Sequence, residues 1–140
     1  MRIRIPLLLL AAVLCLAPAA AQKRTPSPEQ VARYRAVRMS RQLELPDKTA
    51  DAFIPVYEAF QMEMNGIMQQ SAAQRNQAVK TDADAEGRIL SDFRTSRALL
   101  DLRERYYLEF KKILPPLQIR KMYSLEKRNA EHSLERQHED

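Results

Sequence analysis

The sequence predicts an all-α fold, arranged as an elongated antiparallel helical hairpin with short flanking helices, four helices in total. Three observations support this prediction. The 140-residue chain contains only two glycines, Gly66 and Gly87. No stretch alternates apolar and polar residues for the length of a strand. Long segments instead repeat apolar residues at steps of three and four, which is the period of a helix.

The first 21 residues predict a signal peptide. Arg2 and Arg4 precede an apolar run, residues 7–16, that is too short to span a bilayer, and residues 19–21 form a small-residue cleavage site. The single cysteine, Cys15, lies in this segment. We therefore expect a cysteine-free mature chain, exported to a periplasm, without disulfides or a transmembrane segment after processing.

Residues 22–30 are expected to form a disordered leader and residues 31–130 a single helical domain. The first helix should run from about Pro28 to Leu43, because proline suits a first-turn position. Its expected apolar side consists of Val31, Tyr34, Val37 and Met39.

The second helix is expected after Pro46, with Asp47 as its capping residue. Its apolar residues share one stripe: Ala50, Phe53, Ile54, Tyr57, Phe60, Met64, Ile67 and Met68. Pro55 falls inside this pattern, where a proline removes one backbone hydrogen bond and costs about 3 kcal/mol. Either the helix kinks at Pro55, or residues 47–54 form a separate short turn and Pro55 begins the main helix.

The third helix should follow a bend within residues 71–80, because Thr81 and Asp84 indicate a capping box. Its expected core stripe is Ile89, Phe93, Leu100, Tyr107, Phe110 and Leu114. A second stripe lies beside it: Leu99, Leu102, Tyr106 and Ile113. The C-terminal half of this helix should therefore be covered on two sides.

Pro115 and Pro116 should end the third helix, and Pro116 can start a fourth. The fourth helix carries Ile119, Met122, Tyr123, Leu125 and Ala130. A charged tail is expected over residues 131–140.

The expected helix lengths predict an elongated shape. At 1.5 Å per residue the second and third helices would be about 35 and 50 Å long, whereas a compact domain of this size is about 35 Å across. A thin layer of this kind leaves apolar surface uncovered unless a second copy joins it. We therefore expect a homodimer with a concave exposed face.

The N-terminal part of the mature chain is strongly basic. Removing Arg2 and Arg4 lowers the formal charge from +5 to +3, and residues 23–41 carry six basic residues against Glu29. This excess indicates either a solvated helix face or a surface that attracts acidic polypeptides or anionic membranes. Nucleic acid is not an expected partner outside the cytoplasm.

Two short segments at helix junctions carry a family resemblance. Leu45-Pro46-Asp47-Lys48-Thr49 and Leu114-Pro115-Pro116-Leu117-Gln118 both resemble the Leu-Thr-x-x-Gln signature of the Spy/CpxP family of exported, all-helical envelope-stress proteins. Prolines replace both threonines, and Thr49 replaces the first glutamine. The motif also fits a purely architectural interpretation, in which Leu45 and Leu114 enter the core while the next residues start a helix.

The segments around these motifs extend the likeness. Residues 45–60, with Phe53, Pro55 and Tyr57, and residues 114–128, with Pro116, Gln118 and Tyr123, are similar to the Bacteroidetes branch of the family. Members of that branch are often labelled sensors of extracytoplasmic sigma factors. The likeness covers the mature chain from about Val31.

The resemblance implies a dimeric cradle that shields unfolding envelope proteins without ATP. Four arginines would attract clients by charge: Arg33, Arg35, Arg38 and Arg41. Four apolar side chains would supply adaptable contact: Phe60, Met62, Met64 and Met68. Methionines at helical spacing are also typical of a core, and this alternative stays open for Met64 and Met68.

The sequence predicts neither an enzyme nor a cofactor. The mature chain has no cysteine nucleophile, no histidine inside a patterned segment and no glycine-rich phosphate loop. His132 and His138, with Glu135 and Glu139, lack one-turn His-x-x-x-His spacing, so no metal site is expected. Two functions remain: an ATP-independent chaperone, or a stress sensor or regulator that acts through one specific partner. A metal-binding sensor is the less favoured form of the second.

Overall fold

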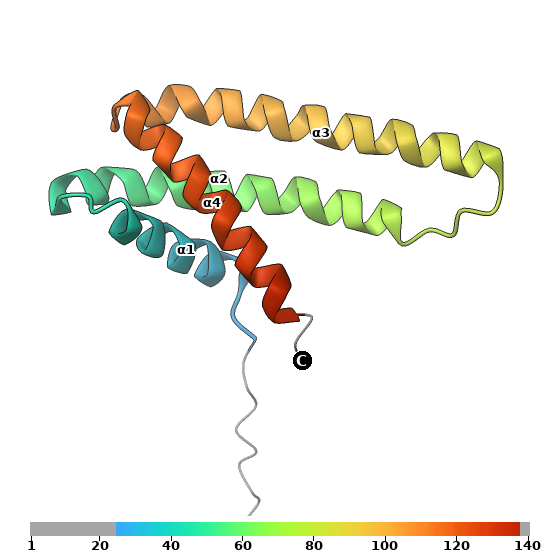
Figure 1. Ribbon diagram of the computed structural model, residues 1–140, viewed down its shortest axis with the longest axis horizontal. Helices are drawn as coiled ribbons and strands as arrows, with labels where there is room; N and C mark the ends of the chain where they lie inside the picture. The colour runs from blue at the N-terminus through green and yellow to red at the C-terminus, as the bar shows by residue number, and fades with distance from the viewer. Residues whose placement is uncertain (1–24, 138–140) are drawn as a thin grey trace, which may run out of the picture.

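The computed structural model describes the backbone of residues 25–137 and the side chains of residues 25–132 (Figure 1). It contains four α-helices and, within the described range, no strand. The predicted all-α class is confirmed, as is the long hairpin. The predicted signal peptide, the first residues of the expected leader and residues 138–140 lie outside the described range.

Helix α1 spans Pro28–Gln42 and begins with a capping box. The hydroxyl of Ser27 accepts from the Gln30 amide at 3.3 Å, and Oε1 of Gln30 accepts from the Ser27 amide at 2.9 Å. The last three residues assigned to the leader therefore form the first turn of this helix. Its buried face is Ala32, Ala36, Met39 and Ser40. The expectation for Tyr34 is wrong: it is 67% exposed, because the small alanines on the opposite side of α1 allow close packing against α2.

The junction after α1 is a Schellman motif. The amide of Leu45 donates to the Ser40 carbonyl at 3.1 Å, and the amide of Glu44 donates to the Arg41 carbonyl at 3.0 Å. Glu44 has φ 54°, the left-handed conformation that usually favours glycine at this position. The motif reverses the chain within a few residues and delivers it to the start of α2.

Helix α2 spans Asp47–Arg75 and runs without a break through Pro55. The alternative in which Pro55 begins the main helix is therefore wrong. The prediction that Asp47 caps this helix is also wrong, because Pro46 occupies the N-cap position and no side chain makes a capping bond there. Proline fixes the backbone angle before the helix, so Asp47 becomes its first residue.

Helix α3 spans Asp82–Phe110 and begins with the predicted capping box of Thr81 and Asp84. The backbone amide of Lys80, together with Thr81, holds the pKa of the Asp84 carboxyl below its ordinary value. Arg88 donates to the carbonyls of Gln74 and Gln77 at 3.2 and 2.9 Å, which ties α3 to the end of α2. The Arg88 side chain thus closes the hairpin bend.

The assignment of the core stripe on α3 is largely wrong. Leu102, Tyr106 and Phe110 are buried, whereas Ile89, Phe93 and Leu100 are each more than half exposed. Of the first stripe, Phe110 and Leu114 lie in the core. The second stripe supplies Leu102 and Tyr106 to the core, and Ile113 packs against it.

Helix α4 spans Pro116–Gln137, so the helix continues through most of the expected charged tail. Residues 131–137 contain no glycine or proline, and charged residues such as glutamate and arginine are good helix formers. Figure 1 shows α4 crossing α2 while α3 runs antiparallel to α2. Ala130 is exposed, contrary to expectation.

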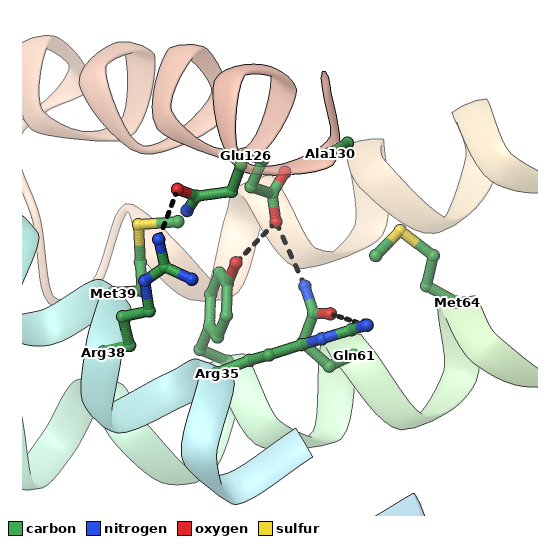
Figure 2. A pocket seen from close by; sticks show the side chains of 9 residues that line it. Arg35, Arg38, Met39, Gln61, Met64, Glu126 and Ala130 are labelled. Carbon is green, nitrogen blue, oxygen red and sulfur yellow. Dashed lines mark hydrogen bonds between the residues drawn. The ribbon is translucent and has the colours of Figure 1, made fainter. Parts of the chain in front are cut away.

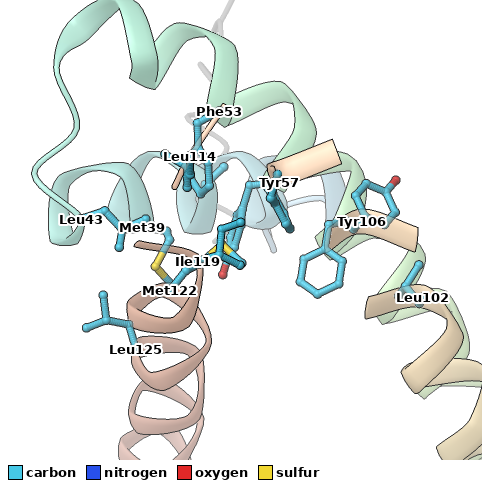
Figure 3. Packing of buried hydrophobic residues seen from close by; sticks show 13 residues of the cluster. Met39, Leu43, Phe53, Tyr57, Leu102, Tyr106, Leu114, Ile119, Met122 and Leu125 are labelled. Carbon is cyan, nitrogen blue, oxygen red and sulfur yellow. The ribbon is translucent and has the colours of Figure 1, made fainter. Parts of the chain in front are cut away.

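The apolar core lies at one end of the molecule, where all four helices meet (Figure 3). Five aromatic rings form its centre, with centroid separations from 5.2 to 6.3 Å: Phe53, Tyr57, Phe60, Tyr106 and Phe110. Along the rest of the hairpin, between residues 62 and 101, the buried positions are Ser71 and Ser91. Half of the hairpin therefore has no buried apolar core of its own.

Candidate functional site

The largest group of exposed apolar side chains lies on α3. Six of the ten large apolar residues exposed in the described range belong to this helix. Four of them form one line at spacings of four, seven and seven residues, here called the α3 stripe: Ile89, Phe93, Leu100 and Tyr107. Leu90 and Leu108 flank it and are 48% and 60% exposed. A line of exposed apolar side chains of this kind is typical of an interaction site.

The predicted client-binding residues do not belong to this stripe. Phe60 is fully buried, so the folded chain does not present it to a client. Met62 and Met64 are half-buried, and Met64 and Ile67 pack against the core, while Met68 is 40% exposed. The apolar residues on α2 therefore serve mainly the core.

The four arginines lie on α1 and are exposed. In Figure 1, α1 and α3 lie on either side of α2. Arg33 forms an ion pair with Glu58 of α2 at 3.2 Å. Of the predicted client-binding residues, Arg35, Arg38 and Met64 line one pocket, whereas Phe60 is buried.

Two of these arginines line a pocket between α1, α2 and α4. Its volume is about 370 Å³, within the usual range for small-ligand pockets. Arg35, Arg38 and Met39 come from α1, Tyr57, Gln61 and Met64 from α2, and Glu126, Asn129 and Ala130 from α4. Figure 2 shows Glu126 pointing from α4 toward the two polar groups of α2.

Glu126 is held by two hydrogen bonds from α2. The Tyr57 hydroxyl donates to Oε1 of Glu126 at 2.9 Å, and Nε2 of Gln61 donates to the same oxygen at 3.2 Å. Burial raises the pKa of Glu126 above its ordinary value, opposed by the Tyr57 hydrogen bond and the charge of Arg103. Burial and the nearby Glu126 also raise the pKa of Tyr57, which stays a neutral donor.

Arg35 and Arg38 pair with amides and not with acids. Arg35 donates to Oε1 of Gln61 at 3.3 Å, and Arg38 donates to Oδ1 of Asn129 at 3.2 Å (Figure 2). Among the described side chains neither guanidinium lies within 4.0 Å of a carboxylate oxygen. Two positive charges therefore flank the pocket without an ion-pair partner in this part of the chain.

A second polar group joins α2 to α3. Glu63 accepts from Arg105 at 2.6 Å and from the Tyr106 hydroxyl at 2.6 Å. These hydrogen bonds hold the pKa of Glu63 below its ordinary value, while burial, followed by Glu63, raises the pKa of Tyr106 to about 12. The group fixes the register of the hairpin beside the aromatic core.

The residues of the family-like motifs lie at the helix junctions or inside the helices that follow them. Leu114 is buried in the core and Leu45 packs against it. Pro116 is the first residue of α4, and Gln118 is half-buried beside it. Tyr123 donates to the Arg103 carbonyl at 3.5 Å. Phe53 and Tyr57 belong to the core, and Pro55 is exposed within α2. These positions fit the architectural interpretation of the motif.

Sequence reasoning missed Glu126 and Gln61. Both are polar residues at helical spacing from core residues: Glu126 follows Met122 by four positions, and Gln61 follows Tyr57 by four. A polar residue on the apolar face of a helix is the signal that could have identified them.

The described residues contain no group of three or more potential metal-binding side chains. His132 is exposed at the end of the described side chains, and His138 lies outside them. The expectation that the histidines form no metal site stays a prediction of the sequence.

The fold defines the chain as an all-helical hairpin protein with an exposed apolar stripe. Within residues 25–137, none of the helices combines the length and apolar content required to cross a bilayer. Comparison with protein-family models, curated proteins and solved structures finds no match. The resemblance to the Spy/CpxP family therefore stays a prediction.

Proposed function

We propose that the protein is an ATP-independent chaperone of the periplasm that binds unfolded segments of envelope proteins along the α3 stripe. The exposure of Ile89, Phe93, Leu100 and Tyr107 is the observation that carries this proposal. The signal-peptide pattern of residues 1–21 supports export.

The dimensions of the stripe suit a client segment. From residue 89 to 107 it is about 27 Å long, enough for about eight residues of extended chain. Aromatic and branched aliphatic side chains would contact apolar client residues without a fixed sequence. Charged residues of both signs flank the stripe, including Arg97, Arg103 and Glu104, and keep the chain soluble.

A second copy of the chain is a less suitable occupant of this stripe. Parallel pairing would place Arg103 opposite Arg103 of the second copy. Antiparallel pairing about the centre of the stripe would place Arg97 next to Arg97. Like charges at such positions disfavour association. The expected homodimer would therefore use another surface. Analytical ultracentrifugation tests whether the chain dimerises.

The test uses the purified chain from residue 22. Equimolar protein should suppress the aggregation of several unrelated denatured clients. The double variant Phe93→Ser/Leu100→Ser should lose most of this effect. The matched control, Arg94→Ser/Asp101→Ser, changes two exposed positions of α3 away from the stripe and should retain it.

The alternative is a regulatory subunit that binds one specific partner. An intact chain that protects no client, combined with a single dominant partner captured from an envelope extract, would favour the regulator. Protection that is equal in the stripe variant and the control would refute the stripe as the client site. Added salt should weaken protection only if the α1 arginines contribute.

A further inference from the structure

The pocket between α1, α2 and α4 combines three properties of a ligand site. It is concave, with a volume of about 370 Å³. It has an apolar wall, formed by Met39, Met64 and the Tyr57 ring. It also has a few polar groups held in place by hydrogen bonds. Such a combination is typical of sites for small organic molecules.

The charges around the pocket favour an anion. Within the described residues, Arg35 and Arg38 donate to the amide oxygens of Gln61 and Asn129, and Arg103 of α3 adds a third positive charge near Glu126. Against them stands Glu126, which accepts hydrogen bonds from Tyr57 and Gln61. The balance of these groups is positive, so an anionic group is attracted to the arginine side of the pocket.

A carboxylate matches these arginines better than a group of higher charge. A guanidinium offers a planar pair of donors that fits a carboxylate with two parallel hydrogen bonds. A doubly charged anion would be repelled more strongly by Glu126 at the inner side. Methionine side chains adapt to apolar groups of varied shape, so the wall suits a short aliphatic or aromatic group attached to the carboxylate.

We propose that this pocket binds an organic carboxylate with a short apolar group, held at Arg35 and Arg38, with its apolar part against Met39, Met64 and Tyr57. Two sources carry this chemistry: a free small acid, and the C-terminal residue of a peptide. None of the α3 stripe residues lines the pocket, so this site does not depend on client binding.

Isothermal titration calorimetry on the chain from residue 22 tests the proposal. The probes are N-acetyl-leucine and N-acetyl-leucinamide, which differ in the carboxylate alone. The acid should bind at least about tenfold more tightly than the amide, because a charge-assisted pair is lost in the amide. A pentapeptide ending in leucine, with a free or an amidated C-terminus, identifies the source. If only N-acetyl-leucine binds, the ligand is a small acid; if the free-ended peptide binds as well, the site accepts peptide termini.

The double variant Arg35→Gln/Arg38→Gln should weaken binding of the acid by about tenfold or more. The matched control is Arg41→Gln, an exposed arginine of the same helix that does not line the pocket. It should change the dissociation constant less than about twofold. Circular dichroism melts verify that both variants fold.

Three results would overturn the proposal: no binding of either acid-ended probe, equal binding of acid and amide, or equal weakening in Arg41→Gln and the double variant. A chain that binds N-acetyl-leucine yet protects no client would keep this site and refute the chaperone. A chain that protects clients but binds neither acid-ended probe would refute this site and keep the chaperone.

Discussion

The hydroxyl of Tyr57 donates a 2.9 Å hydrogen bond to the carboxylate of Glu126, and this bond joins the middle of the core to α4. Tyr57 also stacks on Phe53 at 5.2 Å and contacts Phe60 and Phe110. One side chain thus links the aromatic cluster to the pocket. A change in the charge of Glu126 should therefore affect the stability of the whole helical end.

Replacing Glu126 with glutamine should stabilise the protein near pH 7. Burial raises the folded-state pKa of Glu126, so the folded chain keeps this proton at pH values where the unfolded chain has released it. Stability therefore falls as pH rises from about 4.3, the unfolded value, through the raised folded value. Glu126→Gln keeps an acceptor for the Tyr57 hydroxyl and cannot ionise, so it removes this loss of stability at higher pH. Thermal melts should show a higher Tm for the variant near pH 7, with a difference that shrinks toward about pH 4.

The control for that experiment is Glu104→Gln, which changes an exposed carboxylate of α3. It should leave the pH dependence of the Tm unchanged. A constant difference between Glu126→Gln and wild type at every pH would contradict the prediction.

Replacing Phe60 with alanine should destabilise the fold by about 3–5 kcal/mol, because it leaves a cavity beside the three rings that Phe60 contacts, Tyr57, Tyr106 and Phe110. Urea denaturation measures this loss. Met68→Ala, at a position 40% exposed, should cost less than about 1 kcal/mol. Should Phe60→Ala keep wild-type stability, the burial of this ring would be wrong and a direct contact with clients would be possible again.

Alanine should be more stable than glycine at positions 66 and 87. Both glycines lie inside long helices, and a new methyl group at either would meet no heavy atom within 4 Å apart from its chain neighbours and the adjacent backbone of its own helix. Each substitution should add about 0.5–1 kcal/mol, because glycine loses more backbone freedom on folding. The midpoint of urea denaturation should rise for each variant. A fall in either midpoint would show that the site is more crowded than the structure indicates.

Glycine should be more stable than glutamate at position 44. Glu44 has φ 54°, a conformation that costs a side-chain-bearing residue about 1–2 kcal/mol and glycine almost nothing. Part of this gain is lost to the greater freedom of glycine in the unfolded chain, so the net increase should be about 0.5–1 kcal/mol. Glu44→Ala is the matched control, since alanine keeps the β-carbon. Equal stability of the two variants would argue against the Schellman geometry.

Much of the fold could be predicted because its boundaries depend on local chemistry. Pro46 and Pro116 set the starts of α2 and α4, and Thr81 with Asp84 sets the start of α3. Such signals act within a few residues and can be found in the sequence alone. The error at the N-terminus of α2 was one position, since Pro46 takes the place expected for Asp47.

The choice between the two stripes of α3 could not be made in this way. Periodicity shows that two apolar stripes exist, but contacts distant in sequence decide which one meets α2. Glu63 receives hydrogen bonds from Arg105 and Tyr106, which orients the second stripe toward α2. Ile89, Phe93 and Leu100 of the first stripe are left exposed for the same reason. The pocket was missed for a similar reason, because Glu126 and Gln61 belong to helices whose crossing the sequence does not specify.

The uneven placement of the core has a consequence for motion. Between residues 62 and 101 the buried positions are serines, and Ser91 is hydrogen-bonded to Gln74 across the hairpin. Local unfolding of this segment exposes little apolar surface, so the segment should open while the aromatic core stays folded. Backbone amides between residues 62 and 101 should exchange with deuterium early, whereas those near Phe53 and Phe110 should exchange only through global unfolding. Ile89 and Phe93 lie in the fast-exchanging segment, and Leu100 and Tyr107 lie at or beyond its edge. The stripe therefore extends from the part of the hairpin that opens easily to the part held by the aromatic core.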